Sequence, residues 1–145
     1  MSDMFFSSES PCIGICSTVY GDNFCRGCKR NYLEVIDWNR YDDVQKQTIN
    51  QRLQQQIESV MNKFIVVIDP EKLKTQLDQV ALRKPIYQSA LCWAYELLRL
   101  KSTEMKCLGD YGLQAKSPYE TLTINGLFTQ IDDCIYTLVN TWSAA

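Results

Sequence analysis

Apolar residues recur every three or four positions from about residue 42 onward, which is the spacing of one face of an α-helix. The first such stretch begins at Asp42, with Gln45 three residues later as its capping partner. Its inward positions are Ile49, Leu53, Ile57, Val60, Met61, Phe64, Ile65 and Ile68. Residues 64–68 are rich in β-branched side chains and would also suit a short strand, but we expect the helix to continue through them.

Further helices follow from the same spacing and from the positions of proline. Asp69 and Pro70 match an N-cap followed by proline at the first helical position, and the inner face comprises Leu73, Leu77, Val80 and Ala81. Pro85 separates this helix from residues 86–100, which are apolar around most of the circumference and should form the central helix of a bundle. Residues 102–116 are expected to form a loop with one helical turn.

The last helix is predicted to start at the capping box of residues 117–120, in which proline occupies the first helical position. Its apolar stripe consists of Ile124, Leu127, Phe128, Ile131, Ile135, Leu138, Val139 and Trp142. With short connections and no internal repeat, the pattern predicts a bundle of four to five helices over residues 42–145.

Residues 9–41 follow a different pattern, which is dominated by cysteine. Cys12, Cys16, Cys25 and Cys28 form two closely spaced pairs with eight residues between them. This spacing is typical of a metal site with four thiolate ligands, in which two short loops each provide two sulfurs. A turn signal at residues 21–23 predicts a short hairpin that carries the two pairs.

A second capping box, Asn31 to Glu34, predicts a short helix after the cysteines. Leu33, Ile36 and Trp38 are expected to face inward from it. The predicted fold is therefore mainly α, with a small four-cysteine metal-binding knuckle module at residues 9–41 followed by a four- to five-helix bundle at residues 42–145.

Composition and charge narrow the possible functions. The chain is 46% apolar and 22% charged with a net charge of −2, so it lacks the basic field that draws proteins to nucleic acid or to anionic membranes. It contains no histidine, which excludes mixed cysteine–histidine zinc sites and histidine-dependent catalytic dyads and triads within this chain. The first ten residues lack a basic leader, and the longest aliphatic run is too short to span a membrane. Together with an odd number of cysteines, this predicts a cytoplasmic protein.

The sequence leaves the identity of the metal open. Four thiolates give the same site charge around Zn²⁺ as around a common oxidised iron–sulfur core, and Arg26, Lys29 and Arg30 would stabilise either anion. Two residues between the second pair, followed directly by a helix, favour a structural zinc site. Neither pair matches a familiar ferredoxin spacing.

The cysteine segment resembles a known family. Residues 10–16 (SPCIGIC) and 24–30 (FCRGCKR), followed by Glu34 and Trp38, are similar to short bacterial proteins grouped as domain of unknown function 1289, which are often labelled iron–sulfur proteins. The resemblance covers roughly residues 10–52 and implies that the four cysteines are the metal ligands, with Arg30, Glu34 and Trp38 as typical module residues. It implies no activity, and the long helical extension departs from the usual short chains of the family.

Other polar and sulfur-containing residues allow plainer interpretations. Cys92 and Cys134 lie within apolar patterns and are expected to pack in the core, whereas Cys107 lies in a loop where a reactive thiol is possible. The glutamine-rich run 45–56 is expected to be a solvated helix face. Asp132 and Asp133 are expected at the surface, because adjacent helical positions point apart.

These patterns favour a non-enzymatic interaction or regulatory protein that is stabilised by its metal and has a protein partner. No small-molecule substrate is evident. An iron–sulfur electron-transfer or redox-sensing protein is the main alternative, because the same four thiolates would hold a cluster. A nucleic-acid-associated zinc protein is the weaker alternative, and it depends on Arg26, Lys29 and Arg30 with the rings of Tyr20, Phe24 and Tyr32 nearby.

Overall fold

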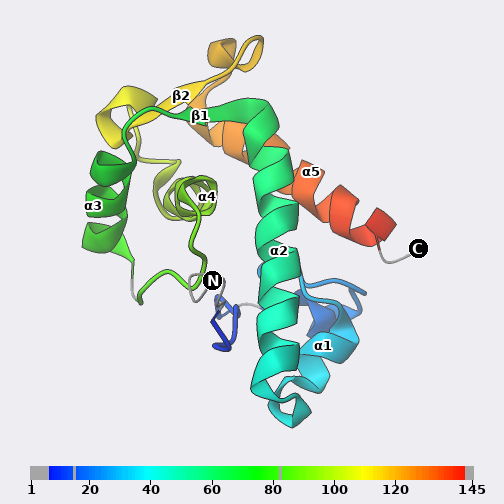
Figure 1. The fold of residues 1–145 in the computed structure, drawn as a ribbon. Helices are drawn as coiled ribbons and strands as arrows, with labels where there is room; N and C mark the ends of the chain where they lie inside the picture. Colours follow the sequence, from blue (N-terminus) through cyan, green and yellow to red (C-terminus); the bar gives the residue numbers. More distant parts are fainter. Residues whose placement is uncertain (1–6, 15, 82, 143–145) are drawn as a thin grey trace.

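The computed structural model describes residues 7–14, 16–81 and 83–142 (Figure 1). The helices are α1 (Tyr32–Ile36), α2 (Asp43–Phe64), α3 (Pro70–Val80), α4 (Ala90–Lys101) and α5 (Ile124–Trp142), and the strands are β1 (Ile65–Val67) and β2 (Leu113–Ala115). Short 3-10 helices lie at Ser17–Tyr20, Trp38–Arg40, Leu108–Tyr111 and Tyr119–Thr121. The predicted mainly α fold class is confirmed. The prediction that the first ten residues lack a basic leader falls partly on residues 1–6, which lie outside the described residues.

Helix α2 is the long axis of the molecule, with α1 beside its amino-terminal end and the two strands beyond its carboxyl-terminal end (Figure 1). Its predicted capping box is present, because Asp42 Oδ1 accepts from the Gln45 amide at 2.8 Å and Gln45 Oε1 accepts from the Asp42 amide at 2.9 Å. Its apolar face is buried at Leu53, Ile57, Val60, Met61 and Phe64. The helical periodicity therefore identified the core face within α2, but the prediction for Ile68 is wrong, because Ile68 lies beyond the helix and is 56% exposed.

The end of α2 differs from the prediction. The helix stops at Phe64, and β1 pairs antiparallel with β2 in the register Ile65 to Ala115, Val66 to Gln114 and Val67 to Leu113. Both the continued helix and the loop expected at residues 102–116 are wrong at this point. A strand of three residues is stable only when a partner strand accepts its hydrogen bonds, and here that partner is distant in sequence.

Helix α4 lies at the centre of the bundle, and α3 packs along one side of it. Asp69 caps α3 by accepting from the Lys72 amide at 3.1 Å, with Pro70 in the first turn as predicted. Helix α4 begins at Ala90 rather than at residue 86, because the Ser89 side chain provides its cap. It packs against α2, α3 and α5, which confirms the prediction of a central helix.

Helix α5 also starts later than predicted. Ser117 Oγ donates to Glu120 Oε2 at 2.6 Å, but the chain forms a 3-10 turn there, and α5 begins at Ile124. The Thr123 hydroxyl provides the cap, since it accepts from the Gly126 amide at 3.0 Å. The buried residues of α5 are Leu127, Ile131, Ile135 and Val139. No helix in the described residues combines the length and the apolar composition needed to cross a membrane.

Candidate metal centre

The second cysteine pair lies in a tight loop whose ends are held together by backbone pairing. Phe24 and Asn31 form an isolated antiparallel bridge across the base of the loop. Inside it, the Cys25 amide donates to the carbonyl of Arg30 at 2.8 Å, and the Lys29 amide donates to the carbonyl of Cys25 at 2.8 Å. Lys29 has a φ of +72°, a left-handed conformation that a non-glycine residue adopts rarely, so other contacts must hold it in place. The hairpin predicted between the two pairs is replaced by the 3-10 helix Ser17–Tyr20, so that prediction is wrong.

The thiols of this loop are close together and buried. Cys25 and Cys28 share a side-chain hydrogen bond, and because Cys28 donates to the Cys25 sulfur, the pKa of Cys25 falls to about 4. The same hydrogen bond and burial raise the pKa of Cys28, which keeps the proton. Arg30 Nε donates to Cys28 Sγ at 3.2 Å. The two sulfurs therefore lie side by side, as two chelating ligands do, and because a metal binds cysteine as thiolate, Cys28 would give up its proton on binding.

The first cysteine pair lies in the segment that packs beside this loop. The Gly14 amide donates to Cys12 Sγ at 3.3 Å, and Gly14 has a φ of +96°, which a residue with a side chain would rarely adopt. Cys16 Sγ lies 2.9 Å from Thr18 Oγ1. The adjacent Ser17 Oγ accepts from the Arg26 amide at 2.8 Å, so the two cysteine segments contact each other directly.

The structure brings the two pairs into one region without joining four sulfurs at one point. Cys12 and Cys28 line the same cavity. Among the described residues, no three histidine, cysteine or carboxylate side chains are grouped closely enough to hold a metal ion. The donor chemistry nevertheless fits Zn²⁺ or an iron–sulfur cluster, since thiolates are their preferred ligands. The convergence of all four cysteines therefore stays a prediction.

The three cations predicted to stabilise the site have different partners. Arg30 is 3% exposed and contacts Cys28 as well as the Trp38 ring, whose centroid lies 4.9 Å from the guanidinium carbon. Lys29 and Arg26 instead reach helix α5, where Lys29 Nζ lies 2.8 Å from Asp132 Oδ1 and Arg26 donates to Asp133 at 2.9 Å. Of these three cations, Arg30 is the one that donates a hydrogen bond to a cysteine sulfur in the described part of the chain.

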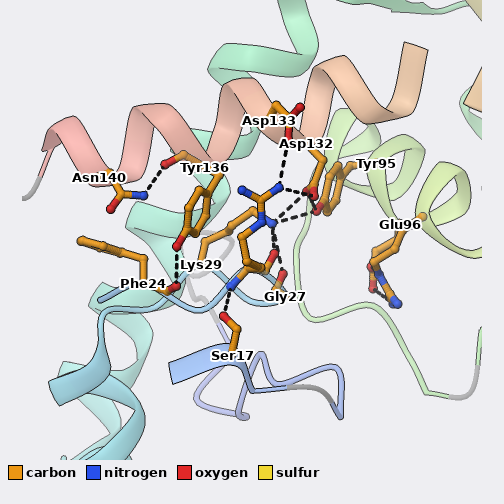
Figure 2. Close-up of polar contacts among 12 residues, drawn as sticks. Ser17, Phe24, Gly27, Lys29, Tyr95, Glu96, Asp132, Asp133, Tyr136 and Asn140 are labelled. Carbon is orange, nitrogen blue, oxygen red and sulfur yellow. Dashed lines mark hydrogen bonds and ion pairs between the residues drawn. The ribbon is translucent and has the colours of Figure 1, made fainter. Parts of the chain in front are cut away.

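Sequence reasoning missed the cluster that anchors the loop to the bundle. Figure 2 shows that the Lys29 side chain reaches both Asp132 and Tyr95. The Tyr95 hydroxyl donates to Asp132 Oδ1 at 2.6 Å and lies 3.3 Å from Lys29 Nζ. The Tyr136 hydroxyl of α5 donates to the carbonyl of Phe24 at 3.1 Å. The guanidinium carbon of Arg26 stacks on the Tyr136 ring, 4.1 Å from the ring centroid. These partners are more than sixty residues from the loop in sequence, and no local pattern identifies them.

Helix α1 is attached to α2 through its capping box. Asn31 Oδ1 accepts from the Glu34 amide at 2.8 Å, and Glu34 Oε1 accepts from the Asn31 amide at 3.0 Å, as predicted. The same carboxylate receives two hydrogen bonds from Arg52 of α2, at 2.5 Å and 2.8 Å. Glu34 therefore caps one helix and binds the next.

The inward positions predicted after the cysteines are wrong for Leu33 and Ile36 and confirmed for Trp38. Leu33 is 51% exposed and Ile36 is 69% exposed, whereas Trp38 is buried at 6%. Because the capping box and Arg52 hold the polar side of this short helix against α2, its apolar residues point outward. With Val19, Tyr20 and Tyr32 they are the exposed large apolar side chains of residues 16–41 that the structure describes. We call this group the apolar patch.

The burial predicted for the remaining cysteines and polar residues is confirmed for some of them and wrong for others. Cys92 is buried at 1%, as predicted, but Cys134 is exposed rather than packed in the core. Cys107 is exposed in its loop. The glutamine-rich run is not wholly solvated, since Gln54 and Gln56 are buried. Asp132 is half-buried and ion-paired, which corrects its predicted surface role.

Comparison with known proteins addresses the cysteine segment alone. Residues 10–57 match the family described as Protein of unknown function (DUF1289). Over 45 residues the chain is 44% identical to the uncharacterized protein YdhL of Escherichia coli K12 and, to the same extent, to YdhL of Shigella flexneri. Each match covers 31% of this chain and 56% of the relative, so the chain spans about half the length of the curated relatives it matches. No solved structure matches the chain.

The matched range contains all four clustered cysteines, the capping box of α1 and Arg52. It ends within α2, and the rest of the bundle lies outside it. The resemblance predicted from the cysteine pattern is thereby confirmed, and the segment of residues 10–57 is similar to the DUF1289 family, whose function is unknown.

Proposed function

We propose that Cys12, Cys16, Cys25 and Cys28 bind one metal centre and that the protein is a non-enzymatic, cytosolic interaction or regulatory protein stabilised by that centre. The observation that supports this most directly is the loop of residues 24–31, in which Cys25 and Cys28 share a hydrogen bond beside Arg30. The lowered pKa of Cys25 favours its thiolate form, whereas Cys28 would release its proton on binding, so metal affinity should depend on pH.

The position of the first pair supports the same proposal. Arg26, between the two cysteines of the loop, binds Ser17, which directly follows Cys16. In this proposal Cys12 and Cys16 provide the other two sulfurs of the centre. Zn²⁺ with four thiolate ligands has no open coordination position, which suits a structural site and not a catalytic one.

The interaction role is supported by the apolar patch. Five large apolar or aromatic side chains on the metal-binding segment are exposed, with Ile36 at 69% and Tyr20 at 87%. Exposed apolar side chains mark a protein interaction surface when they form one contiguous patch, which is what we propose for these five. The cations offer less support for nucleic-acid binding, because Lys29 and Arg30 are 1% and 3% exposed and Arg26 is paired with Asp133.

An iron–sulfur protein remains the second candidate because of one contact. Arg30 Nε donates a hydrogen bond to Cys28 Sγ, and hydrogen bonds to the sulfurs of a cluster help to set its reduction potential. In this candidate the same four cysteines hold the cluster, and the function is electron transfer or redox sensing.

The metal is tested by purifying the full chain without oxygen and measuring bound metals, acid-labile sulfide and visible absorption. One zinc per chain in a colourless sample supports the structural site, whereas iron with sulfide and a brown colour supports the cluster. Cys16→Ser and Cys28→Ser should each lose the metal. Cys134→Ser is the matched control, because Cys134 is an exposed thiol on α5 and should leave the metal content unchanged. A wild-type protein without bound metal would contradict the proposal.

The interaction role is tested separately with a photo-crosslinking residue at position 36 in living cells. The matched control is position 68, where Ile68 is exposed to 56% but lies outside the apolar patch. We expect a discrete protein adduct from position 36 alone, and we expect it to disappear in a Cys16→Ser background. Equal adducts from both positions, or none from position 36, would contradict an interaction surface here.

A further inference from the structure

We propose that a cavity between the cysteine segment and the helical bundle binds a small carboxylate with an apolar body. The inner chamber of this cavity has a volume of about 250 Å³. A protein cavity of ~150 Å³ accommodates benzene, so this chamber would hold a molecule of about ten non-hydrogen atoms. This ligand is additional to the proposed metal and would lie beside it, because Cys12 and Cys28 also line the chamber.

The walls of the inner chamber are mainly apolar and come from both parts of the chain. The cysteine segment contributes Pro11 and Ile13, while the bundle contributes Leu77, Ile86 and Leu100. These walls would bury a hydrocarbon body, and each methylene group removed from water would add to the affinity.

One aromatic wall is held in place by a hydrogen bond. Trp93 lines the chamber, and its Nε1 donates to the carbonyl of Tyr87 at 2.8 Å. A wall that is fixed before the ligand arrives reduces the entropy lost on binding.

The chamber opens into an outer mouth that carries positive charge. The mouth is a second hollow of about 750 Å³, and it shares Arg83, Lys84 and Trp93 with the chamber. Its lining also includes Lys74 and Asp78, which bind each other at 3.0 Å. Arg83 donates to the uncharged carbonyl of Ser10, so its charge is not neutralised by that contact. In a chain with a net charge of −2, this positive mouth stands out.

The charges inside the chamber leave the mouth as the place for an anionic group. Arg99 and Glu96 both line the chamber, but they form an ion pair with Nε and Oε1 2.7 Å apart. Among the charged side chains of the described lining, Arg83 and Lys84 are therefore the two that form no ion pair with a carboxylate. An apolar body in the chamber would thus place its carboxylate at the mouth, whereas a cationic group there would be repelled.

Calorimetric titration of the full-length protein tests this preference with three eight-carbon probes. Octanoate should bind saturably with one site per chain, 1-octanol at least about tenfold more weakly, and octylamine not detectably. Lys84→Glu should weaken octanoate binding by about tenfold, because it reverses a charge at the mouth without touching the core. Lys106→Glu is the matched control, since Lys106 is an exposed lysine outside both linings, and its affinity should equal that of the wild type.

Fluorescence quenching tests the location of the ligand. 8-Bromooctanoate should quench the wild-type tryptophan emission with a saturable component, and Trp93→Phe should remove that component while octanoate still binds. The proposal is overturned if octanoate shows no saturable binding, if octylamine binds as well as octanoate, if Lys84→Glu binds as tightly as Lys106→Glu, or if the quenching survives in Trp93→Phe. Loss of the metal in Cys16→Ser is a separate readout, because Cys16 lies outside the lining of the chamber, so the two proposals can fail independently.

Discussion

Lys29 Nζ lies 2.8 Å from Asp132 Oδ1, and this ion pair joins the loop of the second cysteine pair to helix α5. The Lys29 side chain is 1% exposed and that of Asp132 is 21% exposed, so water screens the pair weakly. Tyr95 and the carbonyl of Arg26 also bind the Lys29 ammonium group. Lys29, which directly follows the predicted metal ligand Cys28, thus attaches the loop of residues 24–31 to the bundle through polar contacts.

Asp132→Ala should lower the free energy of unfolding by about 3 kcal/mol, because it leaves the buried Lys29 charge without its carboxylate. Urea denaturation followed by circular dichroism measures the change. The matched control is Asp133→Ala, which removes a 62% exposed carboxylate from Arg26 and should cost less than about 1 kcal/mol. Equal losses in the two variants would show that burial of Lys29 is not important. Replacing both partners, as Lys29→Met with Asp132→Leu, should recover part of the loss.

Trp38→Ala should destabilise the protein by about 3 to 5 kcal/mol, because Trp38 is 6% exposed and its removal leaves a cavity beneath Arg30. Ile36→Ala, two residues earlier, should change stability by no more than about 0.5 kcal/mol, since Ile36 is 69% exposed. Thermal unfolding of the two variants side by side measures the difference. A large loss in Ile36→Ala would mean that α1 packs with its apolar face inward.

Glu34→Ala should lower the free energy of unfolding by about 2 to 3 kcal/mol, because one change removes the capping box of α1 and the partner of Arg52. Glu104→Ala is the matched control, since that carboxylate is also ion-paired but is 63% exposed, and its loss should stay below about 1 kcal/mol. Guanidinium denaturation provides both values. Indistinguishable midpoints would argue against a joint capping and bridging role.

Cys92 predicts a pH dependence of stability. Burial is the largest cause that raises the pKa of this thiol in the folded protein, whereas an unfolded thiol ionises near pH 8.5. Above that pH the unfolded chain binds fewer protons than the folded one, so stability should fall as pH rises, by up to about 1.4 kcal/mol per pH unit from this group. Cys92→Ala should show a shallower decline between pH 8 and pH 10 in urea titrations at each pH. An unchanged slope would contradict the buried neutral thiol.

The local parts of the fold were predictable from the sequence. The caps of α1, α2 and α3 were identified by residues within four positions of one another, and all three have the predicted bonds. The apolar spacing of α2 and α5 likewise identified their buried faces. Capping and helical periodicity depend on neighbours within one or two turns, so the sequence contains all the information that they need.

The errors occur where distant residues determine the outcome. Residues 65–67 form a strand because residues 113–115 lie beside them, although their neighbours in sequence would also permit a helix. Cys134 was assigned to the core from its apolar neighbours, yet the orientation of α5 on the bundle exposes it. In α1, the attachment of Glu34 to Arg52 determines which side faces α2, and so the apolar patch points outward.

The sequence by itself determined the helical segments, their caps, the paired cysteines and the family resemblance, because each depends on residue types at short spacing. Only the tertiary structure decided that Lys29 binds Asp132, that the cysteine segment closes a cavity against the bundle, and that Arg83 and Lys84 line its mouth. Contacts of this kind join residues that are far apart along the chain. They form only when several packing surfaces are satisfied together, so no local pattern encodes them.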